Sequence, residues 1–554
     1  MSKRVIIVGG VAGGASCAAR LRRLDEQAKI FMYERGADVS FANCGLPYYL
    51  GGVITNRQKL LLATPERVRD WFNVEVRIHH EVLKIDREAR TVDVRNTQTG
   101  ETTTQSYDTL VLAPGAAPIR PSLPGVDLPG VFTIRNLTDI DQVQNWIAQR
   151  EAERAVVIGG GYIGLEMTEN LIHRGLDVTL FEMLDQVMPP MDPEMVVAAH
   201  EVLRARGVDL QLSNSVTAIS EGPEETLKVI DRASQSHFAD LVIMAVGVRP
   251  DVGLARDAGL QIGHTGGIRV DDQMRTSDPA IFAVGDAVEV RDFVTAQPAL
   301  IPLAGPANRQ GRIAADVIAG RSSSFRGTQG TAVLGLFDLT LAMTGATEKT
   351  LKRLGTPYEV IHIHGNDHAG YYPGAHMMAI KLLFSPDDGR VLGAQVTGRA
   401  GVDKRIDVIA MAIQKGATVF DLEETELCYA PQYGSAKDPV NMAGFVASNI
   451  LRGDVVPADW DHWYARRDAG EPLPVVLDVR TPEEFAADAV PDAINIPLGE
   501  LRARLDELPR DGELWVHCGI GQRAYYACRI LQQHGYRVRN LAGGLKTFKL
   551  KNGM

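Results

Sequence analysis

Two stretches of the chain share one order of apolar runs, glycines and acids. A strand is expected at residues 4–8, a glycine-rich turn at 9–14, a helix to about residue 24, and a second strand at 29–33 that ends in Glu34. The same order returns later, with a strand at 155–158, glycines at 159–164 and a strand at 177–181 before Glu182. Continuous apolar runs are typical of buried parallel strands. The repeat therefore predicts an α/β chain with two dinucleotide-binding units.

The glycines in these turns predict nucleotide binding. They allow a tight turn close to a pyrophosphate, the helix N-terminus offers free N–H groups, and the acid after the second strand bonds the ribose. The second copy is complete, with Gly159, Gly161, Gly164 and Glu182. In the first copy Val11 stands where the second glycine belongs, and the predicted residues are Gly9, Gly10, Gly14 and Glu34. Either turn alone could be a simple strand–helix corner.

Beyond residue 325 the pattern changes twice. Residues 325–451 lack a third fingerprint and are expected to form a mixed α+β domain. Residues 452–472 are polar and rich in Pro and Asp around an aromatic cluster at 460–464, which favours a linker that packs on a neighbour. A new α/β pattern occupies residues 473–554.

Size and charge narrow the possible partners. A chain of 554 residues is long enough for three or four domains, and 45% apolar with 23% charged residues is ordinary for a globular protein. The net charge of -11 favours solubility and argues against nucleic acid or an anionic membrane as partner. Without an apolar signal core or a long apolar run, neither secretion nor a membrane span is expected.

The five cysteines do not form a disulfide framework, because they are few, odd in number and irregularly spaced. No CxxC pair suggests zinc, so no metal site is predicted. A reducing cytoplasm is the expected setting.

The two units, with the segments 109–115 and 280–286, resemble the flavoprotein disulfide reductases that have two dinucleotide folds. The resemblance implies FAD on residues 1–113 and 248–324, NAD(P)H on 114–247, and a dimerisation domain at 325–451. It assigns Asp286 to the flavin ribityl chain, and it adds Arg35, Ser40, Asn43, Gly115 and Gly247 to the cofactor sites. Because a carboxylate at Glu182 repels a 2′-phosphate and no arginine follows at 183–185, NADH is favoured over NADPH.

Residues 40–49 match the redox region of that family but contain one cysteine, Cys44. An intramolecular dithiol is therefore impossible there, and the oxidised partner must come from outside. This narrows the resemblance to the single-cysteine branch, which comprises coenzyme A disulfide reductases, NADH oxidases and NADH peroxidases. Near a helix start the Cys44 thiolate would be stabilised and could exchange with a disulfide or persulfide. The alternative is a small buried hydrophobe.

Other features favour the coenzyme A branch. Arg20, Arg22 and Arg23 lie on the first predicted helix, where guanidiniums could meet the phosphates of coenzyme A. A solvated basic helix face is the alternative. Tyr371 and Tyr429 stand in segments that resemble those supplying two active-site tyrosines from the partner subunit, which implies a homodimer. Taken without the family, both would be interface or core residues.

Residues 473–554 resemble rhodanese domains across nearly their whole length, with segments at 477–485, 491–497 and 514–524. Cys518 follows a buried strand and precedes a glycine-rich turn into a helix, so backbone N–H groups would stabilise a thiolate or persulfide. Arg523 could add charge or brace the loop. A catalytically silent domain is the alternative. Packing is favoured for Cys17, Cys428 and Cys528.

The resemblance implies an FAD- and NADH-dependent reductase of persulfides, polysulfides or coenzyme A disulfide, in which Cys518 passes sulfane sulfur on. Coenzyme A itself could serve as substrate or stay bound to Cys44. One rival is an NADH oxidase or peroxidase that cycles Cys44 through a sulfenic acid. Another is a sulfurtransferase in which the flavin part is regulatory. The sequence does not rank the candidate substrates.

Overall fold

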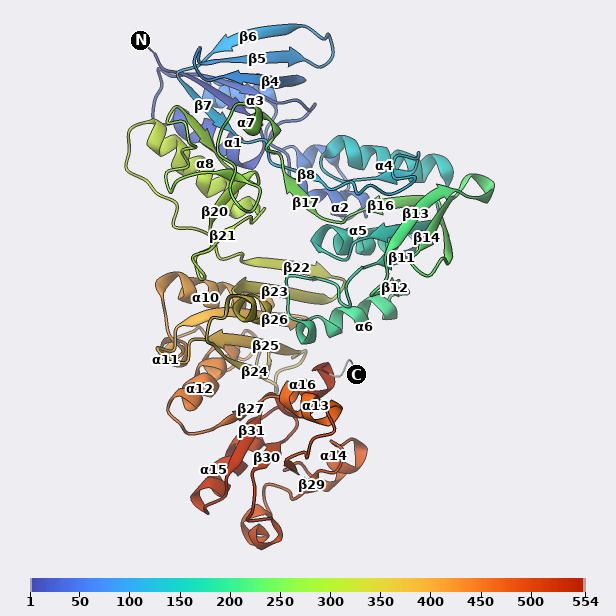
Figure 1. Cartoon of the computed structure of the whole chain (residues 1–554), viewed down its shortest axis with the longest axis vertical. Coiled ribbons are helices and arrows are strands. Elements are labelled where there is room, and N and C mark those ends of the chain that lie inside the picture. The colour runs from blue at the N-terminus through green and yellow to red at the C-terminus, as the bar shows by residue number, and fades with distance from the viewer. Residues whose placement is uncertain (1, 552–554) are drawn as a thin grey trace. The chain divides into compact units, whose positions relative to one another are not determined.

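The computed structural model describes residues 2–551, which form two compact units. The first unit runs to Val187 and resumes over Leu203–Gly330, and the second combines Met188–Val202 with the chain from Thr331 onward. Figure 1 shows the elements of each unit. Among the described residues, no helix has the length and apolar character that crossing a membrane requires.

A parallel sheet of buried apolar strands begins the first unit. Its order is β19-β7-β1-β2-β3. The strands are β1 (Arg4–Val8), β2 (Lys29–Tyr33), β3 (Glu75–Arg77), β7 (Thr109–Leu112) and β19 (Ile281–Ala283). Helices α1 (Ala12–Arg22) and α8 (Ala304–Ile318) meet backbone to backbone, since a Cβ at Gly311 would lie 2.2 Å from Gly13 O.

A second parallel sheet repeats this design in the same unit, with the order β12-β11-β10-β16-β9. Its strands are β9 (Val131–Phe132), β10 (Arg154–Ile158), β11 (Asp177–Phe181), β12 (Asp209–Gln211) and β16 (Leu241–Met244). Helix α5 (Tyr162–His173) follows β10, and α4 (Leu137–Arg150) begins with a capping box between Asn136 and Asp139. The two glycine turns thus mark two real strand–helix units, which confirms the α/β class.

Short antiparallel sheets complete the first unit. One contains β4 (His80–Asp86), β5 (Thr91–Asn96) and β6 (Thr102–Ser106); another contains β13 (Val216–Glu221), β14 (Leu227–Asp231) and β15 (Ser236–Ala239). A third sheet holds β18 (Ile268–Arg269), β20 (Val288–Arg291) and β21 (Pro298–Ala299). Strand β8 (Ala116–Pro118) pairs with β17 (Val248–Pro250), close to both expected ends of the second nucleotide domain. Helices α2 (Leu46–Leu50) and α3 (Pro65–Phe72) precede β4 in sequence, and α7 (Gly253–Asp257) follows β17.

The second unit contains an antiparallel sheet, which explains why residues 325–451 lack a nucleotide fingerprint. Its order is β22-β23-β26-β25-β24. The strands are β22 (Ala332–Leu336), β23 (Leu339–Gly345), β24 (Glu359–Asn366), β25 (Met377–Phe384) and β26 (Val391–Gly398). The helices are α9 (Glu348–Leu354), α10 (Val402–Lys415), α11 (Val419–Glu424) and α12 (Pro439–Leu451). This arrangement confirms the expected α+β domain.

Residues 188–202 were expected in the nucleotide-binding domain, but they cluster with the antiparallel sheet of the second unit. Asp192 accepts a hydrogen bond from Gln395 Nε2, and Thr397 donates to Met195 O at 2.7 Å. Buried polar groups on β26 therefore hold this segment. Nothing in the local sequence shows these partners, because they lie about two hundred residues away.

The second unit also contains a parallel sheet with the order β27-β31-β30-β28-β29. Its strands are β27 (Pro457–Ala458), β28 (Val475–Asp478), β29 (Ile494–Asn495), β30 (Leu514–His517) and β31 (Val538–Leu541). The helices are α13 (Trp460–Asp468), α14 (Pro482–Ala487), α15 (Gln522–Gln533) and α16 (Gly544–Lys551).

The range 452–472 differs from the expected linker. Strand β27 pairs with β31, and Trp460 and Trp463 of α13 are fully buried against Trp515 and Phe548. The two tryptophans bury a large apolar area in the C-terminal domain. The sequence did not indicate this, because the stretch is mostly polar and lacks helical periodicity. This range therefore begins the C-terminal domain.

Candidate functional site

The first glycine turn is fixed by the acid that the sequence paired with it. Gly10 N donates to Glu34 Oε2 at 2.9 Å, and Ser40 N donates to Gly10 O at 2.9 Å. A Cβ at Gly14 would lie 1.9 Å from Gly9 O, so helix α1 approaches the turn more closely than any side chain permits. Val11, which stands where the second glycine of the fingerprint belongs, is the N-cap residue of α1.

The second turn has the same geometry. Gly160 N donates to Glu182 Oε2 at 2.7 Å, and Leu184 N donates to Glu182 Oε1 at 2.9 Å. A Cβ at Gly164 would lie 1.8 Å from Gly159 O, whereas no atom lies within 4 Å of one at Gly161. The open space beside Gly161, at the N-terminus of α5, is the cradle that a pyrophosphate requires. Both turns fit a dinucleotide.

Asp286 follows β19 in a half-buried position near Arg135. Burial raises the pKa of Asp286, and Arg135 opposes this shift. A carboxyl group at a strand end suits the hydroxyls of a ribityl chain, as expected. The guanidinium of Arg35, another predicted cofactor residue, lies 2.9 Å from Asp251. The remaining predicted residues lie in loops: Gly115 accepts from Asp251 N, Gly247 accepts from Ile119 N, and Asn43 begins the short turn that contains Cys44.

Cys44 lies in the 3-10 turn Asn43–Gly45 immediately before α2, and it is exposed. Burial of the sulfur raises the pKa of the Cys44 thiol, and the carboxylates of Glu166 and Asp286 raise it further. One backbone hydrogen bond lowers it. The chain by itself therefore does not supply the thiolate stabilisation that the sequence suggested, because burial, and then the two acids, oppose the charged form of the sulfur.

Glu166 and Tyr48 belong to the Cys44 site, although the sequence did not single them out. Burial raises the pKa of Glu166 to about 7, and the Tyr48 hydroxyl donates to Glu166 Oε1 at 3.4 Å. Tyr48 lies inside the quoted cysteine motif, and Glu166 follows Gly164 by two residues. This acidic residue so close to a fingerprint glycine was the sequence signal that could have identified Glu166 as part of the site. Near neutral pH this carboxyl group can hold or release a proton beside Cys44.

The three arginines of α1 differ in what they can bind. Arg22 is 3% exposed, and its guanidinium donates to the carbonyls of Phe72, Ala28 and Asn73 at 2.8–2.9 Å. It is therefore committed to joining α1 to α3 and cannot also face a phosphate. Arg20 pairs with Asp316 at 2.7 Å, and Arg23 bonds only Ala19 O among the described contacts.

Tyr371 and Tyr429 meet in the second unit. Their hydroxyl oxygens are 2.9 Å apart, and the side chains are 76% and 49% exposed. The hydrogen bond with Tyr429 raises the pKa of Tyr371. Two loops 58 residues apart thus present one exposed pair of phenols, which is the arrangement expected if the pair serves a site outside its own unit.

Cys518 lies at the carboxyl end of β30, in the turn before α15. Its sulfur accepts a hydrogen bond from Gly521 N at 3.2 Å. Arg523 contacts the same sulfur, and its guanidinium forms two 2.7 Å bonds to the carboxylate of Glu484. A backbone N–H donor together with one braced cation is suited to an anionic sulfur. The structure brings the two predicted residues together and adds Glu484.

Buried charged side chains lie next to the turn that contains Cys518. Arg480 donates to the Asp478 carboxylate through Nε and Nη2, and His517 Nε2 lies 3.5 Å from Asp478 Oδ2. Burial lowers the pKa of His517, which Asp478 only partly opposes. His517 is therefore a neutral part of the scaffold.

Two further thiols, those of Cys17 and Cys528, are buried. Burial raises the pKa of Cys17 to about 12, and it also raises the pKa of Cys528. Both fit the expected packing role, whereas Cys428 is exposed.

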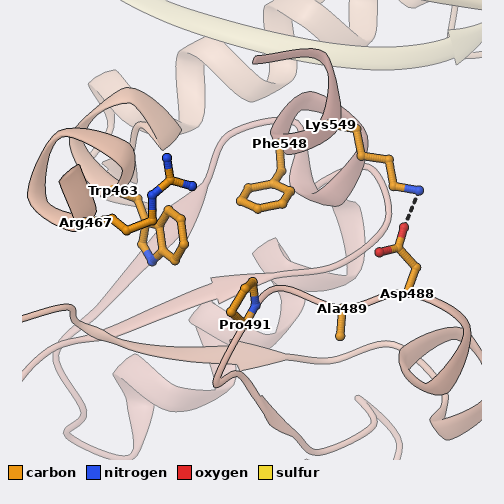
Figure 2. Close-up of a pocket in the computed structure, with 7 residues that line it drawn as sticks. All are labelled: Trp463, Arg467, Asp488, Ala489, Pro491, Phe548 and Lys549. Atoms are coloured by element: carbon orange, nitrogen blue, oxygen red, sulfur yellow. Dashed lines mark ion pairs between the residues drawn. The ribbon is translucent and has the colours of Figure 1, made fainter. Parts of the chain in front are cut away.

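A cavity of about 370 Å³ lies between α13, α16 and the loop after α14 (Figure 2). Trp463, Phe548 and Pro491 give it an apolar lining, and Lys549 at its rim forms an ion pair with Asp488. None of its lining residues comes from the Cys518 turn, and the cavity contains no nucleophile.

Two dinucleotide-type sheets with a lone exposed cysteine, joined to a sulfur-cradling loop, define a pyridine-nucleotide oxidoreductase fused to a sulfur-handling domain. Residues 3–311 match the family Pyridine nucleotide-disulphide oxidoreductase, residues 331–438 its dimerisation domain, and residues 461–551 the Rhodanese-like domain. The chain belongs to this oxidoreductase family, whose members are enzymes that use FAD and NAD(H). The rhodanese match begins at residue 461, within the range expected as a linker.

One of the relatives matches four-fifths of the chain, and two solved structures match nearly all of it. The chain is 38% identical over 445 residues to Coenzyme A disulfide reductase of Staphylococcus epidermidis, covering 80% of this chain and 99% of that one. The crystal structure of reduced Bacillus anthracis CoADR-RHD matches with 49% identity and a TM-score of 0.96, covering 99% and 98% of the two chains. A NAD-dependent persulfide reductase from A. fulgidus matches with 37% identity and a TM-score of 0.90 over 98% and 100%.

Proposed function

We propose that the enzyme uses NADH to reduce persulfides or disulfides of coenzyme A-type thiols, and that its rhodanese domain handles the sulfane sulfur. The observation that carries this proposal is the pair of distinct sulfur sites, an exposed Cys44 in the nucleotide-binding unit and an N–H-cradled Cys518 in the rhodanese domain. For a persulfide the net reaction is NADH + H⁺ + RSSH → NAD⁺ + RSH + H₂S. The names of the relatives point to the same two substrate classes.

Cys44 is the residue proposed to exchange with substrate. Its thiolate attacks the persulfide to give Cys44–S–S–R and HS⁻, and two electrons with one proton then return Cys44–S⁻ and RSH. Bound FAD would supply the passage of the electron pair from the nicotinamide to this disulfide. Because the pKa of Glu166 lies near 7, its carboxyl group can provide the proton that the leaving thiolate takes up.

The second turn supports NADH over NADPH. Glu182 is buried at the end of β11 with both carboxylate oxygens bonded to backbone N–H groups, so its charge is fixed in place. A fixed negative charge accepts ribose hydroxyls and repels a 2′-phosphate. No arginine at 183–185 offsets it.

Coenzyme A recognition is proposed for Arg20 and Arg23, and no longer for Arg22. The exposed phenols Tyr371 and Tyr429 are proposed to reach the Cys44 site of the partner subunit in a homodimer, where one hydroxyl could donate to a leaving thiolate. Their mutual hydrogen bond orients both hydroxyls in advance.

Cys518 is proposed to accept sulfane sulfur and pass it to a thiol such as coenzyme A. The N–H of Gly521 and the guanidinium of Arg523 stabilise the resulting persulfide anion. The bidentate contact with Glu484 keeps Arg523 in place.

The test is anaerobic NADH oxidation with coenzyme A persulfide, coenzyme A disulfide and hydrogen peroxide, for the wild type, Cys44→Ser and Cys518→Ser. We expect persulfide-dependent turnover with sulfide release that Cys44→Ser abolishes. Cys518→Ser should retain turnover of preformed persulfide and lose transfer from thiosulfate. Equal turnover with peroxide, or indifference to Cys44→Ser, would instead support an oxidase or peroxidase. Loss of all turnover in Cys518→Ser would support a sulfurtransferase.

A further inference from the structure

Helix α16 uses its first N–H groups to hold the Cys518 turn. Leu545 N donates to Cys518 O at 2.8 Å, and Lys546 N donates to Gly519 O at 3.0 Å. The first N–H groups of a helix have no partner inside the helix, so a loop carbonyl can satisfy them. Two consecutive carbonyls of the sulfur-carrying turn therefore face α16.

These two bonds decide where the N–H groups of the turn point. In a planar trans peptide the C=O and the next N–H point in opposite directions. With the carbonyls of Cys518 and Gly519 turned toward α16, the N–H groups of Gly519 and Ile520 must point away from it. Gly521 N already donates to Cys518 Sγ. The orientation of the whole N–H cradle thus depends on the position of α16.

The start of α16 fits into a narrow space. A Cβ at Gly543 would lie 3.0 Å from the Cβ of His362, and a Cβ at Gly544 would lie 2.3 Å from Cys518 O. One glycine faces strand β24 of the antiparallel sheet, and the next faces the sulfur-carrying turn. Figure 1 shows α16 beside β24 in this unit. At this point only the backbone of the two glycines separates β24 from the sulfur-carrying turn.

A buried hydrogen bond fixes α16 to β24. His364 Nε2 lies 3.0 Å from Thr547 Oγ1, and both side chains are buried. Burial, with smaller contributions from Lys546 and His362, lowers the pKa of His364 to about 3, so the imidazole is neutral. Trp460 Nε1 also donates to Gly544 O at 3.1 Å, which holds the same helix from inside the rhodanese domain.

Strand β24 is itself anchored by charge. His362 shares a face with His364 because residues two apart in a strand point the same way. His362 Nε2 lies 3.1 Å from Glu194 Oε1, and Glu194 accepts a 2.6 Å bond from the fully buried Lys381. The face of β24 that meets α16 therefore has a rigid polar support.

We propose that His364 and Thr547 are positioning residues for Cys518: strand β24 of the dimerisation domain, acting through α16, sets the geometry of the sulfur cradle in the rhodanese domain. This rests on the proposed function only in that Cys518 carries sulfane sulfur. The transfer steps are Cys518–S⁻ + S₂O₃²⁻ → Cys518–S–S⁻ + SO₃²⁻, then Cys518–S–S⁻ + CN⁻ → Cys518–S⁻ + SCN⁻. Neither step needs NADH.

The test compares Thr547→Val, Thr547→Ser, His364→Leu and the double variant Thr547→Val/His364→Leu in the full-length holoenzyme. Thr547→Val should lower kcat for thiosulfate:cyanide transfer about tenfold with KM for thiosulfate unchanged, because misplacement of a reactive group reduces the rate rather than binding. Thr547→Ser should stay within about twofold of the wild type, and His364→Leu should match Thr547→Val. The double variant should be no worse than either single one, since both remove the same bond.

Thr344→Val is the matched control, because Thr344 is an equally buried hydroxyl on β23 of the same antiparallel sheet and its 2.7 Å bond to Thr331 Oγ1 involves neither α16 nor the segment 193–195 that packs against α16. It should leave transfer unchanged. The rate at which iodoacetamide alkylates Cys518 gives a second measure of the geometry of the turn, one that does not depend on sulfur transfer. Peptide mass spectrometry compares this rate with the alkylation of the exposed Cys428. If the wild type failed to reduce persulfides, the proposed function would fall while this comparison still stood.

Three results would overturn the inference: wild-type transfer and alkylation in both single variants, additive losses in the double variant, or an equal loss in Thr344→Val. Thr547→Ala repeats the test in case the valine methyl disturbs packing. It must then give the same loss as His364→Leu.

Discussion

Lys381 is the buried cation on which the antiparallel sheet of the second unit depends. Its ammonium is fully buried and lies 2.6–2.9 Å from carboxylate oxygens of Asp192, Glu194 and Glu348. Lys381→Met would leave three carboxylates buried around an apolar side chain. Removing one partner of a buried ion pair costs roughly 3–5 kcal/mol, because the remaining charge is left without compensation.

The titration of Glu348 gives an independent magnitude. Burial alone would raise the pKa of this carboxyl group, but Lys381 and Lys352 lower it from 4.5 to about 2. A shift of about 2.5 units corresponds to about 3 kcal/mol of stability. Since the folded pKa is depressed, this contribution is complete above pH 4.5 and is lost as the pH falls toward 2. About 0.8 kcal/mol should be gone at pH 4, and about 1.4 kcal/mol at pH 3.5.

The assay is urea unfolding followed by tryptophan fluorescence and far-UV circular dichroism. Lys381→Met should lose roughly 3–5 kcal/mol at pH 7. The control is Lys352→Met, which removes a 60%-exposed partner of the same Glu348 and should cost less than about 1 kcal/mol. The stability difference between the wild type and Glu348→Gln should shrink between pH 5 and 3.5. Equal losses in the two lysine variants, or a difference that does not change with pH, would refute the reasoning.

Three further predictions concern the sites. Glu484→Gln should lower thiosulfate:cyanide transfer about tenfold by loosening Arg523. Because Arg523 lowers the pKa of Glu484 to about 2 in the folded protein, the ion pair should persist, and wild-type transfer should not reflect its loss, until the pH falls toward about 2. Arg22→Met should lower the thermal midpoint by several degrees with KM for coenzyme A disulfide unchanged, whereas Arg20→Ala should raise that KM. Glu182→Ala should reduce the NADH:NADPH ratio of kcat/KM about tenfold, and an unchanged ratio would contradict the repulsion argument.

The two nucleotide sheets could be predicted because their signals are local. An apolar run, a turn that excludes side chains and an acid at the end of the next strand all lie within about thirty residues. The geometry around Gly14 and Gly164 shows why those positions are glycine, since any Cβ there would overlap a backbone oxygen. Cys518 with Arg523 was predictable for the same reason, because only five positions separate the cysteine of the turn from the arginine in the first turn of α15.

Features that depend on distant partners could not be predicted. Arg20 and Arg22 stand in one basic run, yet Arg22 is buried because the carbonyls that receive it come from residues 72 and 73. The His364–Thr547 bond joins residues 183 positions apart. The burial of Trp460 and Trp463 likewise required a helix that arrives at the chain end. Periodicity carries no information about such pairs.

The two reactive thiols face opposite electrostatic surroundings, and this contrast fits their separate proposed roles. Around Cys44 the chain places Glu166 and Asp286, which oppose a second negative charge. A thiol in such a place releases an anionic partner readily, because repulsion favours departure of the leaving thiolate. Around Cys518 the chain places an N–H donor and a braced guanidinium, which retain an anionic sulfur. The contrast therefore fits the exchange and release proposed for Cys44 and the storage of sulfane sulfur proposed for Cys518.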